Sequence, residues 1–148
     1  MANYGTVAGG DDYFELKLRA DDWENASESD KGKALFEATQ IIDSLNYAGD
    51  KYSSTQELEF PRGEDTEVPD NIIKACYEIA IKLLGGFTRE DALSRVGITS
   101  DNWGPVKRTY DPSQTPEYYL AGVPSAEAWT LLKPFLRTNS GVRIHRVN

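Results

Sequence analysis

The chain has 148 residues, of which 39% are hydrophobic and 27% are charged. That size suits one domain with a real buried core. Its 24 acidic residues outweigh its 16 basic residues, which gives a net charge of -8 and a pI near 4.7. Because an acidic surface repels phosphate groups, the charge argues against non-specific nucleic-acid binding as the main activity, and we expect the free chain to bind DNA weakly.

The sequence predicts neither a disulfide nor a membrane segment. Cys76 is the only cysteine, which excludes an intrachain disulfide and a zinc site made of cysteines. Residues 1–4 hold neither a basic stretch nor an apolar run, so no secretory signal is expected. No apolar run approaches the roughly 18 residues that a membrane helix requires. We therefore expect a cytoplasmic protein, or a particle assembled in the cytoplasm.

The first half of the chain predicts two short elements and one long helix. A short helix is expected over residues 11–19, with Asp11 and Asp12 near the positive end of its dipole and Leu16 and Leu18 on its apolar side. Trp23 follows in an acidic turn and is expected to close the end of the core. The longest periodic pattern predicts a helix over residues 29–47, which Gly49 ends. Its apolar stripe consists of Ala34, Leu35, Ala38, Ile41, Ile42 and Leu45.

A long acidic connection, residues 48–68, precedes a second helix predicted over residues 69–84. Pro69 suits a first helical position and Gly85-Gly86 suits a stop. Apolar residues lie on more than one side of this helix, which fits a central core helix or a contact between subunits. They are Ile72, Ile73, Cys76, Tyr77, Ile79, Ala80, Ile81, Leu83 and Leu84.

The last third is less regular. Residues 88–97 carry a capping signal for a short helix, and residues 106–110 predict a short strand or one arm of a hairpin. Ser125 is expected to cap a last helix, which Pro134 kinks or ends. The predicted fold is mainly α: a small helical bundle with long loops, a short β-hairpin or strand, and an extended C-terminal arm. Residues 1–136 form the helical domain and residues 137–148 form the arm.

The residues offer little catalytic chemistry. The only histidine, His145, lies far along the chain from Cys76, and neither has the partners of a nucleophilic triad. The acidic pairs lack the spacing of a calcium loop, and the Gly-Gly pairs lack the strand and helix of a phosphate loop. We therefore predict that the protein is not an enzyme and has no catalytic residue, metal or cofactor.

The C-terminal end differs in charge from the rest. Residues 128–148 contain four bases and no acid, whereas residues 1–127 contain 12 bases and 24 acids, a charge of -12. This pattern fits a disordered basic terminus. It also fits an arm that binds another subunit, because apolar residues alternate with bases and could add a strand to a partner's sheet. The predicted partner-binding residues are Arg137, Arg143, Ile144, His145, Arg146 and Val147.

About the first 85 residues resemble a family of tailed-bacteriophage head–tail adaptors that are also labelled DnaT-like single-stranded-DNA-binding proteins. Phe60 stands where this family is expected to have tryptophan. The residues that carry the resemblance are Tyr13-Phe14, Trp23, Lys33-Ala34-Leu35, Ala38-Thr39, Ile42-Asp43, Leu45, Tyr47-Ala48-Gly49-Asp50-Lys51, Gln56, Leu58, Phe60-Pro61-Arg62, Val68-Pro69, Ile72, Ala75 and Glu78.

The resemblance implies a structural virion protein. Such an adaptor forms a ring, with the twelve-fold symmetry of the portal protein under which it docks, at the head–tail interface of the virion. It extends the DNA channel, through which packaged DNA passes without specific binding. It also provides a platform for the next tail or nozzle protein. Its partners are therefore the portal, further copies of itself and the downstream tail protein, with no membrane.

Two other functions compete with the adaptor. A single-stranded-DNA-binding replication accessory would use Trp23, Tyr47, Tyr52 or Trp103 to stack on bases and the basic C-terminal end to follow the backbone. Aromatic residues within helical stripes usually belong to the core, which argues against this function. A small enzyme has almost no support among the residues.

Overall fold

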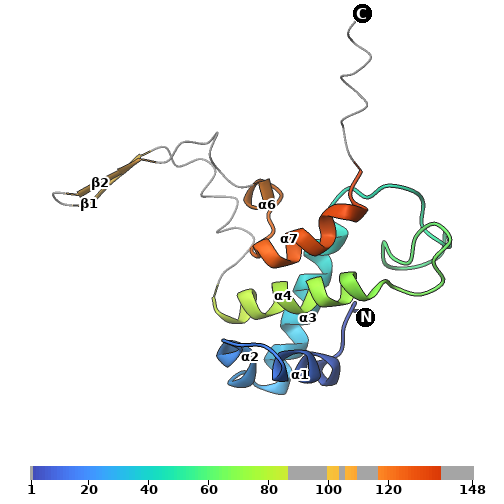
Figure 1. The fold of residues 1–148 in the computed structure, drawn as a ribbon, viewed down its shortest axis with the longest axis horizontal. Helices are drawn as coiled ribbons and strands as arrows, with labels where there is room; N and C mark the ends of the chain where they lie inside the picture. Colours follow the sequence, from blue (N-terminus) through green and yellow to red (C-terminus); the bar gives the residue numbers. More distant parts are fainter. Residues whose placement is uncertain (1, 87–99, 104–105, 110–116, 138–148) are drawn as a thin grey trace, which may run out of the picture.

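The computed structural model describes residues 2–86, 100–103, 106–109 and 117–137 (Figure 1). The fold is mainly α, as predicted. In the described part, no helix is long and apolar enough to cross a membrane. The elements are α1 (Val7–Glu15), α2 (Asp21–Glu24), α3 (Glu28–Asp43), α4 (Asp70–Leu84), β1 (Ser100–Trp103), β2 (Val106–Thr109), α6 (Glu117–Leu120), α7 (Ala126–Leu132) and the 3-10 turn η2 (Lys133–Phe135).

Helix α4 is the centre of the core. It packs on α3, α7, α1 and α2, and Figure 1 shows it between α7 and the α1–α2 pair. Residues 75–80 are all buried. Since six consecutive helical residues point in every direction around the axis, α4 is covered on all sides along this stretch. The prediction of a central core helix is therefore confirmed within a single chain.

Helix α1 begins earlier than predicted. Thr6 is its N-cap, and the Thr6 hydroxyl oxygen accepts a hydrogen bond from the Gly9 N–H at 3.0 Å. Asp11 and Asp12 therefore lie beyond the first turn, so their predicted place at the start of the helix is wrong. Position 10 requires a glycine inside the helix, because a Cβ there would collide with the ring of Trp23. Trp23 is buried at the end of the core, as predicted.

The segment after α1 also differs from the prediction. The helix ends at Glu15, and Arg19 has a φ of 58°, which is incompatible with a continuing helix. Leu16 and Leu18 were expected to contribute apolar surface to the helix, but they are 90% and 86% exposed. The predicted helix over residues 11–19 is therefore displaced toward the N-terminus, and its last four residues form a connection to α2.

Helix α3 is shorter than predicted at its C-terminal end. Ser27 is the N-cap, and its hydroxyl oxygen accepts from the Asp30 N–H at 3.1 Å. The chain leaves the helix after Asp43, because Tyr47 turns inward and its hydroxyl donates to the Ile42 carbonyl at 2.6 Å. Helix α4 has Pro69 as its N-cap and ends at Leu84, close to the predicted bounds.

The C-terminal part agrees with several predictions. Ser125 caps α7 by accepting from the Ala128 N–H at 3.1 Å, and Pro134 lies in the 3-10 turn that follows. Strand β2 covers most of the strand predicted over residues 106–110. It pairs antiparallel with β1, which makes the short hairpin that was one of the predicted alternatives, although the residues of β1 were not predicted. Helix α6 was not predicted either. The helix predicted over residues 88–97 and most of the C-terminal arm lie outside the described residues.

Truncating Ile79 at the centre of α4 is expected to lower the free energy of unfolding substantially. Ile79 is fully buried, so Ile79→Ala should cost about 2–5 kcal/mol by removing buried methylene groups and leaving a cavity. Leu18→Ala removes a similar side chain from a position exposed to solvent and should change stability by less than about 0.5 kcal/mol. Urea unfolding of both variants measures the difference. Equal losses would mean that the core is assigned wrongly.

Candidate functional site

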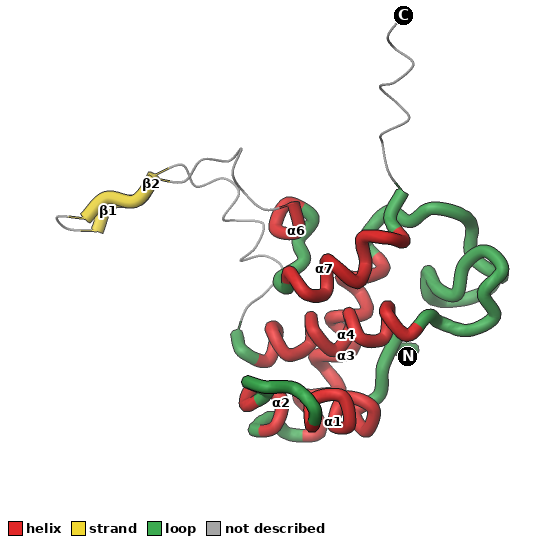
Figure 2. The backbone as a smooth tube through the Cα atoms, viewed as in Figure 1, coloured by secondary structure: helices red, strands yellow, loops and turns green. Residues whose placement is uncertain are grey.

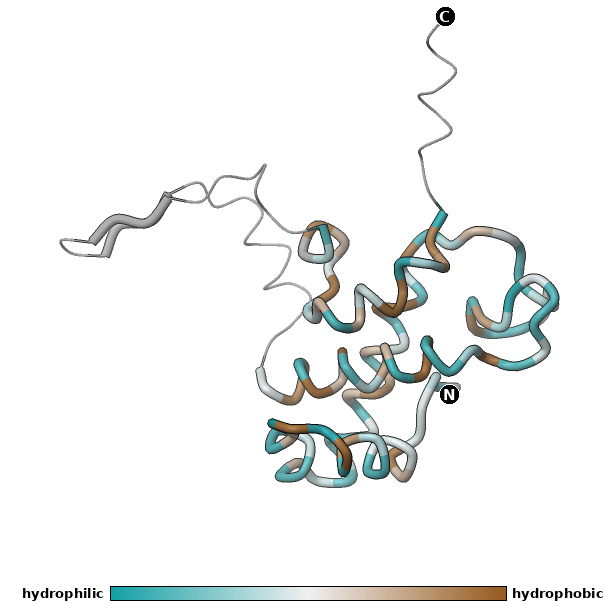
Figure 3. The backbone as a smooth tube through the Cα atoms, in the orientation of Figure 1, coloured by the Kyte–Doolittle hydropathy of each residue, from teal (hydrophilic) through white to brown (hydrophobic). Residues whose placement is uncertain are grey.

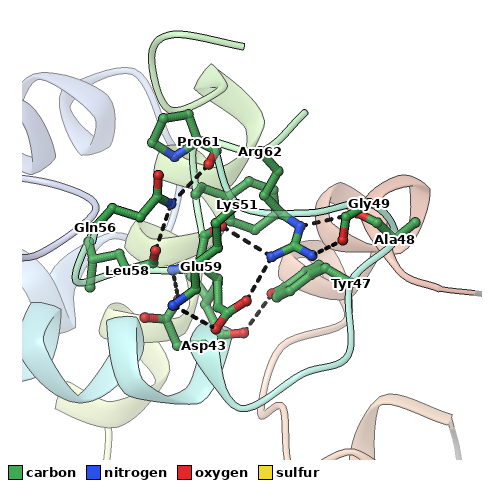
Figure 4. A network of polar contacts seen from close by, with 12 residues as sticks. Asp43, Tyr47, Ala48, Gly49, Lys51, Gln56, Leu58, Glu59, Pro61 and Arg62 are labelled. Atoms are coloured by element: carbon green, nitrogen blue, oxygen red, sulfur yellow. Dashed lines mark hydrogen bonds and ion pairs between the residues drawn. The ribbon is translucent and has the colours of Figure 1, made fainter. Parts of the chain in front are cut away.

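The connection between α3 and α4 is folded around one side chain, Arg62 (Figure 4). Its Nε donates to the Ala48 carbonyl at 3.1 Å, and its two terminal nitrogens donate to the carbonyls of Gly49 and Glu59. It also binds the Glu59 carboxylate at 2.7 Å. These acceptors occupy the guanidinium within the protein, so Arg62 acts as a clamp for the loop and is not available to a phosphate.

A second set of bonds holds the outer part of the loop. The Gln56 side-chain amide donates to the Leu58 and Pro61 carbonyls at 2.8 and 2.9 Å, and its oxygen accepts from the Ser53 N–H at 3.0 Å. An isolated antiparallel bridge joins Lys51 to Arg62. Figure 4 shows these groups converging on one another, which makes the loop an ordered structure despite its irregular backbone.

Beneath the loop lies a cluster of aromatic rings. Phe60 packs edge-on against Tyr47 and Phe135, with ring centroids 4.6 and 5.5 Å apart. The Tyr4 hydroxyl donates to the Asp43 carboxylate and accepts from the Phe60 N–H at 3.1 Å. Burial raises the pKa of Tyr4 and Tyr47, and it raises the pKa of Asp43 as well. The loop residues of the phage resemblance therefore form a closed structural unit.

Two of the four aromatic residues suggested for base stacking are unavailable. Trp23 and Tyr47 are 1% and 2% exposed, so neither can receive a base, and that part of the single-stranded-DNA hypothesis is wrong. Tyr52 is 55% exposed in the acidic connection between α3 and α4. Trp103 lies in β1, where the structure describes the backbone.

Trp23 is also held by a hydrogen bond to a carboxylate. Its Nε1 donates to the Asp11 carboxylate at 2.8 Å, and the Lys31 ammonium donates to the same oxygen at 2.9 Å. The hydrogen bond from Lys31, with that from Trp23, lowers the pKa of Asp11. Asp11 thus serves a structural purpose. The described residues contain no group of three His, Cys, Asp or Glu side chains that could hold a metal ion.

Half of the basic side chains of residues 2–86 are paired with carboxylates. Lys17 binds Glu78 at 2.9 Å and Glu127 at 3.0 Å, which links the segment after α1 to α4 and α7. Hydrogen bonds from Lys17 to these two carboxylates raise its pKa. Lys31, Lys51, Arg62 and Lys133 are paired as well, whereas Arg19, Lys33, Lys74 and Lys82 are exposed and take part in no ion pair among the described residues.

Charge is divided between the two halves of the chain. Residues 1–86 contain 18 acids and 8 bases, a net charge of -10, and residues 87–148 contain 6 acids and 8 bases, a net charge of +2. A phosphate backbone is therefore repelled by the helical body of residues 2–86 far more than by the C-terminal half.

The C-terminal arm has a fixed starting point. The Arg137 N–H donates to the Asn46 carbonyl at 2.9 Å, and the Ala48 N–H donates to the Phe135 carbonyl at 3.0 Å. Leu136 forms an isolated antiparallel bridge with Tyr47. The backbone around Arg137 is thus bound to the chain just after α3. The other predicted partner-binding residues, Arg143, Ile144, His145, Arg146 and Val147, lie outside the described residues.

Cys76 is a core residue. It is buried in α4 beside Thr39, and burial raises the pKa of its thiol to about 12. A thiol that stays protonated at neutral pH is a poor nucleophile, in agreement with the interpretation of Cys76 as a small buried hydrophobic residue.

Residues 2–147 match the family described as "Putative DnaT-like ssDNA binding protein". The chain belongs to this family. The match spans both the acidic helical body and the C-terminal half, so the DnaT-like family is defined over nearly the whole chain. The description of the family agrees with the label "DnaT-like single-stranded-DNA-binding" in the resemblance given above. It supports the single-stranded-DNA hypothesis better than the head–tail adaptor. No curated protein and no solved structure matches the chain.

Replacing Arg62 by lysine should loosen the loop of this DnaT-like protein although the charge is kept. Lysine cannot reproduce the planar set of bonds to three carbonyls and a carboxylate, so Arg62→Lys should lower the free energy of unfolding by roughly 1–3 kcal/mol. Hydrogen exchange of the backbone amides in residues 48–63 should accelerate. The matched control is Arg19→Lys, at an exposed arginine, which should change neither quantity. A loop that keeps its protection in Arg62→Lys would contradict the clamp.

Proposed function

We propose that the chain binds single-stranded DNA through its C-terminal half, with the acidic helical body as the scaffold. The observation that carries the proposal is membership of the DnaT-like family, whose description names this ligand and whose match extends to residue 147. In this proposal the protein acts by binding and not by catalysis.

The hairpin β1–β2 is the element best suited to contact DNA. Within ten residues it carries an aromatic side chain, Trp103, and two adjacent bases, Lys107 and Arg108. The antiparallel register pairs Trp103 with Val106 and Asn102 with Lys107, so the tryptophan and the bases lie on neighbouring strand positions. An aromatic ring can stack on any base, and the cations can bind the adjoining phosphates, which together give binding without strong sequence preference.

The helical body sets a limit on the affinity. Most of its aromatic rings are buried, half of its cations are paired, and its net charge is -10. Repulsion from the body should keep the binding of a free monomer weak and strongly dependent on salt. This agrees with the weak DNA binding expected from the composition.

Binding of a labelled oligo-dT strand, followed by fluorescence anisotropy over a range of salt concentrations, tests the proposal. Trp103→Ala should weaken binding by about 1–3 kcal/mol, because one stacking platform is lost. Lys107→Glu/Arg108→Glu should weaken binding and reduce the slope of log K against log salt by roughly 1.4, the loss of two phosphate contacts.

The control for charge is Lys33→Glu/Lys74→Glu, which changes the net charge by the same amount at two exposed positions of the helical body. Its affinity should stay near that of the unchanged protein. If the two double variants lose the same affinity, total charge and not the hairpin governs binding. If none of the variants affects binding, or the protein does not bind the strand at all, the proposal is wrong.

A second candidate function, the head–tail adaptor, is favoured by the way in which the loop of residues 48–63 is built. The residues that carry the phage resemblance there bind one another, as expected of a structural subunit. We propose for this candidate a ring under the portal at the head–tail interface, assembled in the host cytoplasm. The arm would contact the portal through Arg137, Arg143, Ile144, His145, Arg146 and Val147.

Truncation of the arm tests the adaptor. Because the Arg137 backbone binds Asn46, the cut should follow Arg137 so that the fold is preserved. Removal of residues 138–148 should leave the helical content and Tm nearly unchanged but abolish association with the portal in a pull-down. Arg143→Glu/Arg146→Glu should weaken association in a salt-sensitive way, and Lys33→Glu/Lys74→Glu should not. Full association of the truncated chain would exclude the arm as the anchor.

A further inference from the structure

Two leucines stand in solvent because the lysine between them is turned inward. Leu16 and Leu18 are 90% and 86% exposed, and Lys17 reaches Glu78 at 2.9 Å and Glu127 at 3.0 Å. Glu78 is 3% exposed and depends on this cation for neutralisation. The exposure of the leucines is therefore fixed by an ion pair of the core and does not reflect a loosely packed segment.

The leucines belong to a mixed surface, which we call the leucine groove: Leu16, Leu18, Arg19, Ile81 and Lys82. These residues line one hollow of about 430 Å³, together with Phe14 and the ion-paired side chains of Lys17, Glu78 and Glu127. Arg19 and Lys82 are exposed, and neither takes part in an ion pair among the described residues. Since Lys17 binds both acids of the hollow, its unpaired charges are the two cations, and they flank an apolar centre. This composition is typical of a protein interface, and here it lies on a helical body with a net charge of -10.

The opposite composition is found on the loop that Arg62 clamps. It holds several exposed acids, none of them in an ion pair of the described part, and one exposed aromatic side chain, Tyr52. We call this surface the acidic loop: Tyr52, Glu57, Glu64, Asp65 and Glu67. The loop is ordered by its internal bonds, so little entropy would be lost when it binds.

The two surfaces lie at opposite ends of the helical body. In Figure 2 the connection between α1 and α2 is at the lower left, and the loop between α3 and α4 is at the far right. Figure 3 shows hydrophobic and hydrophilic residues alternating along the first segment, whereas the loop is mostly hydrophilic. One molecule therefore cannot bring its own two surfaces together, but two molecules can.

We propose that the leucine groove of one copy binds the acidic loop of the next copy. Charge complementarity selects this occupant, because the cations Arg19 and Lys82 of the groove would meet the acids of the loop. Leu16, Leu18 and Tyr52 would supply the apolar contact. Since the two surfaces differ and lie at opposite ends, the contact is head-to-tail and can pass from copy to copy. The inference depends on neither candidate function and adds a surface for self-association to both.

Analytical ultracentrifugation over a range of concentrations tests the proposal with two complementary variants. Leu16→Ser/Leu18→Ser removes the groove and keeps the loop, whereas Glu64→Lys/Asp65→Lys alters the loop and keeps the groove. The unchanged protein should gain mass with concentration, and each variant alone should associate at least roughly tenfold more weakly. A mixture of the two should form dimers of one copy of each, because one intact groove meets one intact loop.

Leu120→Ser, at a half-exposed leucine on α6, is the matched control and should associate like the unchanged protein. Circular dichroism verifies that every variant is folded, and Arg19→Glu/Lys82→Glu replaces any groove variant that is not. The proposal is overturned if the unchanged protein stays monomeric, if the groove variant still associates, or if the mixture remains monomeric. Dimers of the loop variant alone would also overturn it, because they would indicate a two-fold contact of groove against groove.

Discussion

The structure depends on the neutralisation of one carboxylate inside the molecule, that of Glu78. Helix α4 can be covered on all sides only if this acid, which lies among its buried residues, finds partners there. Tyr13 donates a hydrogen bond to it and Lys17 provides the opposite charge at 2.9 Å. Removal of the Lys17 charge would leave a buried carboxylate without its counter-ion, a change that costs about 3–5 kcal/mol in comparable cases. The same ion pair orients the α1–α2 connection and thereby exposes Leu16 and Leu18.

The arrangement separates structure from binding along the chain. In residues 2–86 the aromatic rings fill the core, Arg62 and Lys31 are bound to internal acceptors, and acidic side chains dominate the surface. A helical body of this kind is suited to contacts with other protein subunits and unsuited to contacts with phosphates. The C-terminal half holds the excess of bases and the hairpin with Trp103. The DnaT-like family spans both parts, and our proposal assigns DNA binding to the second.

Much of the helical body could be predicted because its signals are local. The apolar periods of α3 and α4 and the cap at Ser125 can be recognised within a few residues, and the structure has them close to the expected positions. The start of α1 was missed because Gly9 and Gly10 resemble a turn, whereas packing against Trp23 makes a glycine necessary inside the helix. Leu16 and Leu18 were expected to add apolar surface to a helix. Their exposure could not be predicted locally, because it depends on the pairing of Lys17 with Glu78, and these two residues are distant in sequence.

The candidate site was predictable only in part, for a similar reason. The burial of Trp23 was predicted from its place in the turn that closes the core, but the clamp at Arg62 depends on backbone carbonyls, which have no sequence signature. The most direct measurement of the central claim is a two-dimensional NMR titration of the indole N–H signals with oligo-dT. The account predicts that the Trp103 signal shifts while that of Trp23, bound to Asp11 in the core, does not. A shift of Trp23 with Trp103 unchanged would contradict it.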